Sequence, residues 1–251
     1  MIVDCHIHIG KSEKFNKYYT FDKCIKLLNL NKVDKAIVMP NVSSIISVKT
    51  LNEEFISEFN NLNLKNKFFP FLLIDYKLKN DIIEQISNNN IIGLKYHGSV
   101  SELEVSNKNL YDFFELAKLK NFPILVHCGR NKLSHISHLI KIAKIFKDVI
   151  FIGCHLGGNA TDLIEEAIFL LGKEKLNNIY LDTSAGKLPH LIEEATKRLG
   201  IDKILYGSDE PYADIRIGKM CVELADISDD DKERIFGKNL LNIIRVNDDK
   251  N

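Results

Sequence analysis

The feature of this sequence that most constrains its fold is a series of eight short apolar runs separated by longer amphipathic segments. The runs are rich in Ile, Val, Leu and Phe and do not alternate cleanly with polar residues, a pattern typical of strands buried on both faces of a parallel sheet. We predict strands at residues 2–9, 35–40, 68–75, 91–97, 123–128, 149–155, 179–184 and 203–209.

The segments between these runs have the residue spacing of helices that bury one face. Gly172 and Gly200 follow two of them, at the position where the C-cap of a helix favours glycine. A strand followed by a helix, repeated eight times, predicts an α/β fold of the (β/α)8 TIM-barrel type, with a doubly wound open sheet as the alternative. We predict helices at residues 20–30, 110–119, 133–146, 161–171 and 188–199.

Length and composition narrow the class of protein. The 251 residues suit one α/β barrel, and no Gly-, Pro- or Ser-rich linker divides them, so we expect a single catalytic domain over residues 1–251. Basic and acidic residues number 34 each, which leaves no broad basic surface for nucleic acid. No apolar run approaches the ~20 residues that span a bilayer. The chain opens on a strand rather than an export signal, and its five cysteines lack CxxC spacing, so we expect a cytoplasmic protein.

Polar side chains gather at the carboxyl ends of the predicted strands. In a barrel these ends surround one mouth, where barrel enzymes have their active sites. Imidazole and carboxylate ligands suit Zn²⁺ and similar divalent ions, and an HxH pair places two imidazoles on one face of a strand. We expect the cation to be bound by His6, His8, His127 and Asp209, with Lys95, His97 and His155 at the same mouth.

The alternation of side chains along a strand predicts which of these residues face inward. If His6 points into the barrel, then Asp4 and His8 should do the same, because side chains alternate with a period of two. By the same rule Cys5 should face the helices, and so should Cys154, which adjoins His155. We therefore expect these cysteines to be packing residues rather than ligands. Asp182 and Ser184, on the seventh predicted strand, could line the mouth.

Together these residues resemble the amidohydrolase superfamily, whose pattern is HxH on strand one, Lys on strand four in some members, His on strands five and six, and Asp on strand eight. Local strings are similar to those of its amidohydrolase-2 branch, which contains metal-dependent hydrolases and related non-oxidative decarboxylases. The similar strings are IGLKYHG at residues 92–98, FIGCHLGG at 151–158, LYGSDEP at 205–211 and IFGKNLL at 235–241, where Leu240 replaces the usual Ala.

The resemblance implies a barrel with one bound divalent ion, Zn²⁺ being favoured over Mn²⁺. In binuclear members the strand-four Lys is carboxylated and bridges two ions, whereas in this branch the resembling Lys is unmodified, which is the interpretation favoured for Lys95. Asp209 and His155 would be the catalytic residues. Lys95, His97 and Arg130 would bind the substrate, since an Arg can hold a carboxylate through two hydrogen bonds.

The favoured reaction is hydrolysis, in which a metal-activated water attacks a small carboxylate-bearing amide, lactone or cyclic ester. Non-oxidative decarboxylation is the main alternative. A nuclease of the TatD type is less favoured, because a Glu is expected where this chain has residues 93–95, and a barrel that only binds a ligand is a further alternative. Only short loops cover the mouth, at residues 11–19, 99–107 and 210–216, so a homodimer could supply additional cover.

Overall fold

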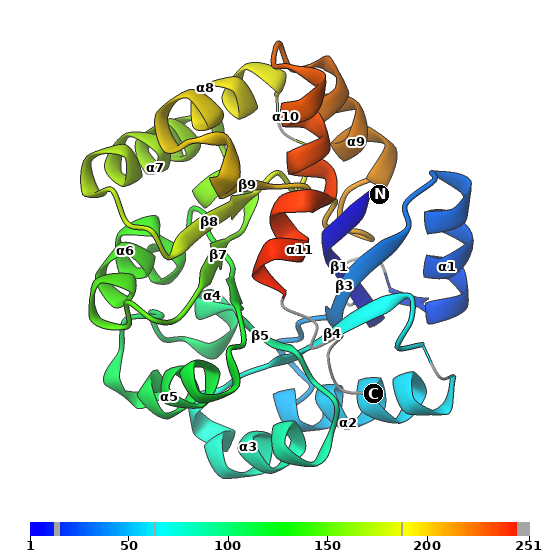
Figure 1. The fold of residues 1–251 in the computed structure, drawn as a ribbon. Helices are drawn as coiled ribbons and strands as arrows, with labels where there is room; N and C mark the ends of the chain where they lie inside the picture. The colour runs from blue at the N-terminus through cyan, green and yellow to red at the C-terminus, as the bar shows by residue number, and fades with distance from the viewer. Residues whose placement is uncertain (13–15, 63, 187, 245–251) are drawn as a thin grey trace.

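The computed structural model of the chain describes residues 1–12, 16–62, 64–186 and 188–244. Its centre is a single curled sheet in which eight parallel strands follow one another in chain order (Figure 1). Each of the eight predicted strands is confirmed, most of them within a few residues. The strands are β1 (Val3–Ser12), β3 (Lys35–Pro40), β4 (Phe68–Leu73), β5 (Gly93–Tyr96), β6 (Ile124–Val126), β7 (Phe151–Gly153), β8 (Ile179–Asp182) and β9 (Ile204–Leu205), with the short β2 (Lys17–Tyr19) antiparallel to the end of β1.

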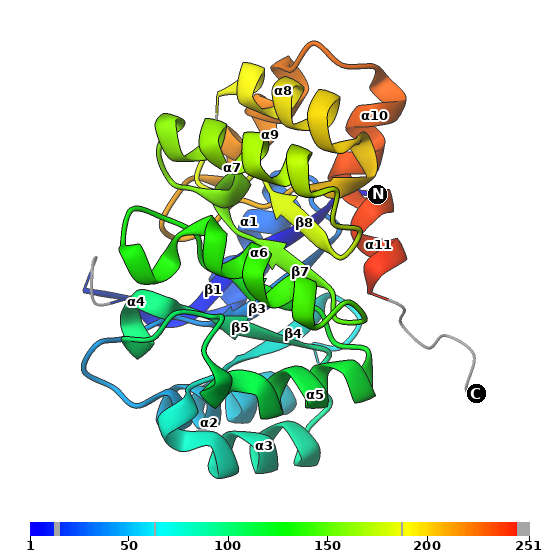
Figure 2. The same cartoon turned by 90° about the vertical axis from the view of Figure 1, so that its left-hand side faces the viewer.

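Helices cover the outer face of this sheet on all sides (Figures 1 and 2). The five predicted helices are confirmed in position. Gly200 ends α8 with a φ of 93°, as expected for a glycine at a helix end. Gly172 does not cap its helix, because α7 continues through it to Glu174. The helices are α1 (Phe21–Leu30), α2 (Val48–Asn61), α3 (Lys79–Asn88), α4 (Gly98–Ser101), α5 (Tyr111–Lys120), α6 (Ile136–Ile145), α7 (Thr161–Glu174), α8 (Pro189–Leu199), α9 (Ile215–Leu224), α10 (Asp229–Glu233) and α11 (Asn239–Ile243).

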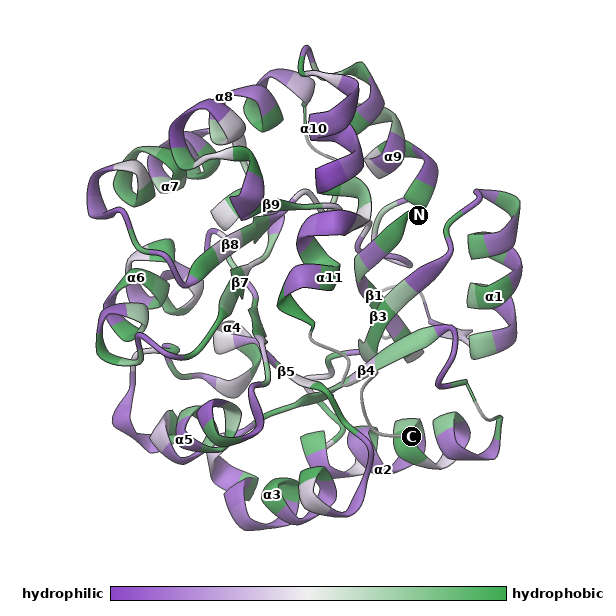
Figure 3. Cartoon of the chain, viewed as in Figure 1, coloured by the Kyte–Doolittle hydropathy of each residue, from purple (hydrophilic) through white to green (hydrophobic). Residues whose placement is uncertain are grey.

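The apolar strand residues divide between two cores. One core lies between the sheet and the helices. The other combines strand residues with side chains of α11, which lies across the end of the sheet where the strands begin (Figure 1). Figure 3 shows the strands as a nearly continuous hydrophobic layer inside more polar helices. A cavity of about 990 Å³ lies at this same end, lined by residues such as Phe69, Tyr180 and Ile243.

An extra residue in β1 changes which side chains face inward. Asp4 pairs with Ala36 and Ile7 pairs with Val38, so three steps along β1 match two along β3, which is a β-bulge. The prediction that Asp4 and Cys5 point inward and outward respectively was therefore wrong. Cys5 belongs to the inner core, whereas Asp4 pairs with Ala36, which belongs to the outer core.

Backbone hydrogen bonds connect the first strand to the segment that follows β9. The amide of Cys5 donates to the carbonyl of Tyr206 at 2.9 Å, and the amide of Asp209 donates to the carbonyl of His6 at 2.8 Å. Ile7 also forms a parallel bridge with Glu210. The first strand is thus hydrogen-bonded to the segment that follows the last strand. None of the helices described is both long and apolar enough to cross a membrane.

Gly93 of β5 provides a test of packing in the inner core. A Cβ atom at this position would overlap the ring of Phe71, which is fully buried. We expect Gly93→Ala to lower the free energy of unfolding by about 1–3 kcal/mol, since an overpacked core must shift. Gly172→Ala is the control, because its Cβ would meet only the side chain of Arg198 in α8 at ordinary contact distance, and alanine favours a helix. Denaturant unfolding should show no loss for this second variant, and equal losses in both would contradict the packing argument.

The buried carboxyl of Asp4 should make the free energy of unfolding depend on pH. Burial raises the pKa of its carboxyl from 3.8 to about 7, and one of its oxygens has no hydrogen-bond partner among the described residues. The folded state therefore holds a proton that the unfolded state loses, so stability falls as pH rises from about 4 to 7, by at most on the order of 4 kcal/mol. Asp4→Asn should flatten this part of the profile, measured by urea unfolding between pH 5 and pH 8. An unchanged slope would contradict the buried-carboxyl account.

Candidate functional site

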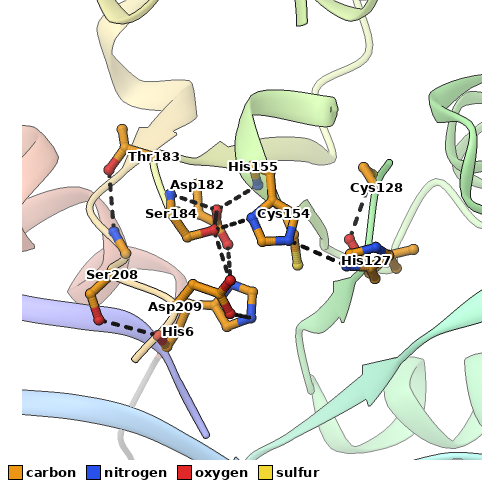
Figure 4. Close-up of polar contacts among 12 residues, drawn as sticks. His6, His127, Cys128, Cys154, His155, Asp182, Thr183, Ser184, Ser208 and Asp209 are labelled. Carbon is orange, nitrogen blue, oxygen red and sulfur yellow. Dashed lines mark hydrogen bonds and ion pairs between the residues drawn. The ribbon is translucent and has the colours of Figure 1, made fainter. Parts of the chain in front are cut away.

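The carboxyl ends of the parallel strands bring imidazoles and a carboxylate into contact, as the sequence predicted. His6 and His8 of β1 turn their Nε2 atoms toward each other at 3.1 Å. The Oδ1 atom of Asp209, just after β9, lies 3.5 Å from Nε2 of His6 and 3.6 Å from Nε2 of His8. All three ligand atoms fall within 4.8 Å of one another. Figure 4 shows Asp209 beside the ring of His6.

The other ring nitrogens of the two histidines have their own partners. Nδ1 of His6 donates to Oδ2 of Asp182 at 2.9 Å, and Nδ1 of His8 donates to the carbonyl of Pro40 at 3.1 Å. Burial lowers the pKa of both imidazoles well below the usual range, so each is neutral and carries one N–H. Both Nε2 atoms therefore present lone pairs to the same point as the carboxylate of Asp209. Three converging acceptors of this kind fit a divalent cation.

Lys95 of β5 places an ammonium group next to these acceptors. Its Nζ atom lies 3.1 Å from Nε2 of His6 and 3.1 Å from Sγ of Cys154, and the side chain is only 1% exposed. Within the described part of the chain no carboxylate forms an ion pair with it. A buried cation without a counter-ion is costly, so this position favours an anionic group on a bound molecule.

Cys154 does not face the helices, contrary to the prediction from strand alternation. It belongs to the inner core and contacts Lys95. The alternation ends here because β7 stops at Gly153, and His155 takes a left-handed backbone conformation with φ of 61°. This turn carries the His155 side chain back toward the mouth, and both Cys154 and His155 can therefore approach the site.

Three further imidazoles, those of His97, His127 and His155, form a second group beside the first. Nε2 of His155 lies 3.2 Å from Nδ1 of His127, and the ring of His127 stacks on that of His97 with centroids 3.9 Å apart. Burial, followed by the charge of Lys95, lowers the pKa of His97 to about 3. The ring of His155 also stacks on that of His6 at 5.4 Å. His127 thus contacts His155 and His97, and its role as a metal ligand stays a prediction.

The contacts of Asp182, which the sequence indicated only as a possible lining residue, and the position of Tyr212 were not foreseen. The fully buried Asp182 contacts His6 and the backbone of His155, a role that a lone Asp at a strand end does not reveal. Tyr212 packs its ring against that of His8 in an edge-to-face arrangement at 5.4 Å. Arg130, a predicted substrate contact, pairs with Asp162 at 3.4 Å, and both side chains are mostly exposed. Its role in binding stays a prediction.

Comparison with known proteins identifies the family and agrees with the fold. The family model described as Amidohydrolase matches residues 3–239. No curated protein matches the sequence. Among solved structures, the chain is similar to 5-carboxyvanillate decarboxylase from Sphingomonas paucimobilis, with a TM-score of 0.74 and 11% identity over 97% of this chain and 98% of that one.

Two other solved structures carry metals. Dihydroxybenzoic acid decarboxylase from a Polaromonas species, with bound manganese and the inhibitor 2-nitroresorcinol, has a TM-score of 0.76 and 15% identity over 98% of this chain and 97% of that one. An amidohydrolase from Burkholderia multivorans with bound zinc has a TM-score of 0.76 and 11% identity over 97% and 99%. Because the family model spans nearly the whole chain, the protein belongs to the amidohydrolase family, in its amidohydrolase-2 branch.

Proposed function

We propose that this protein is a metal-dependent, non-oxidative decarboxylase of small carboxylate-bearing molecules. The observation that carries the proposal is the buried ammonium of Lys95, which lies 3.1 Å from one of the converging imidazole nitrogens and has no carboxylate partner among the described residues. A substrate carboxylate bound at the cation would meet this ammonium. Several of the similar solved structures are decarboxylases of aromatic carboxylates, which supports the same reaction here.

We infer that one divalent ion, Zn²⁺ or Mn²⁺, would be held by His6, His8 and Asp209, with His127 as the further ligand predicted from the sequence. The donor set of neutral imidazoles and a carboxylate suits both metals. Such an ion would supply Lewis-acid stabilisation of negative charge on the substrate. The described geometry supports three of these ligands directly, whereas His127 contacts His155 through its Nδ1 atom.

The other side chains of the site would have separate roles in substrate binding and proton transfer. Lys95 would neutralise the substrate carboxylate, and His97, stacked on His127, would line the pocket. When the bond between carbon and carboxylate breaks, CO₂ leaves and the electron pair stays on the carbon, which then takes up a proton. Asp209 and His155 are the candidates for moving that proton, since both reach the same space as the metal ligands.

Hydrolysis is the second candidate, and the position of Asp209 favours it. Its carboxylate lies at the metal-binding group and could accept a proton from a water molecule that attacks an amide, lactone or cyclic ester. In that case Lys95 and His155 would stabilise the negative charge that develops on the carbonyl oxygen. Both reactions use the same residues, so the products decide between them.

We further propose that the curled sheet is a closed eight-stranded barrel. The hydrogen bonds from Cys5 to Tyr206 and from Asp209 to His6 support this closure, as does the bridge between Ile7 and Glu210. We also propose a small-molecule substrate and a homodimer in which a second subunit adds cover to the mouth; size-exclusion chromatography with light scattering tests the dimer.

Metal content tests the proposed ligands. Protein purified without chelators should contain about one divalent transition ion per chain by inductively coupled plasma mass spectrometry. His6→Ala should lose most of this metal and keep its circular dichroism spectrum, because the variant removes one of the three converging acceptors. His135→Ala is the matched control, since that imidazole pairs with Glu166 on the surface. Full occupancy in His6→Ala would contradict the ligand assignment.

Product analysis tests the reaction and the role of Lys95. With hydroxylated aromatic carboxylates as substrates, we expect release of CO₂ and loss of one carboxyl group from the product. Lys95→Met keeps most of the side-chain volume and removes the charge, so kcat/KM should fall by about 30-fold or more. Lys147→Met, an exposed lysine near the end of α6, is the charge-matched control.

Turnover of amides or lactones with uptake of water and without release of CO₂ would show that the reaction is hydrolysis rather than decarboxylation. An unchanged kcat/KM in Lys95→Met would remove the ammonium from substrate binding. Comparison of Asp209→Asn with His155→Gln, followed by deuterium incorporation from D₂O into the product, identifies the residue that delivers the proton.

A further inference from the structure

We propose that Asp182 and Ser184 form a positioning pair that fixes the tautomers of His6 and His155 together, so that His155 presents Nε2 as a hydrogen-bond acceptor. Both residues lie at the end of β8, between the two imidazoles (Figure 4). The kinetic meaning of this inference rests on the proposed function, in which His6 binds the metal and His155 moves a proton. The tautomers themselves follow from the hydrogen bonds alone.

Asp182 accepts hydrogen bonds on both of its carboxylate oxygens. Oδ2 accepts from Nδ1 of His6 at 2.9 Å. Oδ1 accepts from the backbone amides of His155 at 2.7 Å and Ser184 at 3.0 Å, and it is also in contact with the hydroxyl of Ser184. The side chain is fully buried, so these protein donors replace the solvent that a carboxylate would otherwise need.

The hydroxyl of Ser184 can donate one hydrogen bond, and the carboxylate of Asp182 determines its acceptor. An ionised carboxylate only accepts hydrogen bonds, so the close contact between Ser184 Oγ and Asp182 Oδ1 requires the hydroxyl to donate to Asp182. Ser184 Oγ then faces Nδ1 of His155, 2.8 Å away, with a lone pair. That nitrogen must carry the N–H of the bond.

In its neutral form the imidazole of His155 has one N–H, so in that form Nε2 is left as an acceptor. The contact at 3.2 Å between this atom and Nδ1 of His127 is consistent, with His127 donating. His155 is thereby prepared to take a proton from a hydroxyl group or a water molecule, and it can donate from Nε2 only after it has gained one. The same pair keeps Nδ1 of His6 protonated and its Nε2 available to a cation.

The pair also supports the backbone of His155. A φ of 61° is uncommon for a residue other than glycine and is retained only where the surroundings hold it. The hydrogen bond from the His155 amide to Oδ1 of Asp182, at 2.7 Å, supplies such support. One carboxylate therefore orients a proposed metal ligand through one oxygen and a proposed proton carrier through the other.

Nitrogen NMR of the imidazole rings in metal-free protein tests the tautomers directly. Long-range proton–nitrogen spectra should show His155 and His6 protonated at Nδ1 in the native protein, with the His155 signals assigned by their loss in His155→Gln. Ser184→Ala should shift His155 toward the form protonated at Nε2, and Ser184→Thr, which keeps a hydroxyl, should restore the original form. Asp182→Asn should in addition lower Zn²⁺ affinity by about 10- to 100-fold through His6.

Thr183→Val is the matched control, because it removes a neighbouring buried hydroxyl whose partner is the amide of Gly207 rather than an imidazole. It should leave both tautomers and Zn²⁺ affinity unchanged. A native His155 protonated at Nε2, or a tautomer unaffected by Ser184→Ala, would overturn the proposal. The tautomers are measured without metal or substrate. They can therefore be as proposed even if the protein proves to be no metalloenzyme, so failure of the proposed function and failure of this inference give different results.

Discussion

The placement of the first two histidines depends on one irregularity, the extra residue in β1. Beyond the bulge, Ile7 and His8 pair with Val38 and Met39 in regular register, while Cys5 below it packs in the inner core. A regular strand could not direct both Cys5 and His6 inward, since neighbouring side chains would lie on opposite faces. The bulge lets one short strand fill the core and still supply two imidazoles to the site. Bulges are frequent beside active sites for this reason.

The convergence of lone pairs gives the site its electrostatic character. Neutral imidazoles and the carboxylate of Asp209 all present acceptors to one point, which favours positive charge there. The ammonium of Lys95 already meets part of this need through its contact with His6. A cation bound by the histidines would compete with that contact and release the ammonium toward a bound anion. Metal and substrate binding would then favour each other.

The sequence was sufficient for most of the architecture, because strands buried on both faces are continuous apolar runs whose ends are easily placed. It was less reliable where a single residue decides the direction of a side chain. The bulge beside Asp4 and the left-handed turn at His155 both reversed a prediction based on alternation. The pairing of Asp182 with Ser184 could not be predicted either, since it depends on distances between strands rather than on residue types.

The position of the helix α11 has a consequence for how a molecule can reach the site. Its side chains Leu240 and Ile243 pack against the inner core, and the fully buried Phe71 and Leu125 belong to the same cluster, so the interior is solid between that end and the histidines. The large cavity near Ile243 is thereby separated from the imidazoles. A molecule bound at the histidines would therefore have to approach from the carboxyl ends of the strands. With that one face open to solvent, a product would have to dissociate before the next substrate could bind.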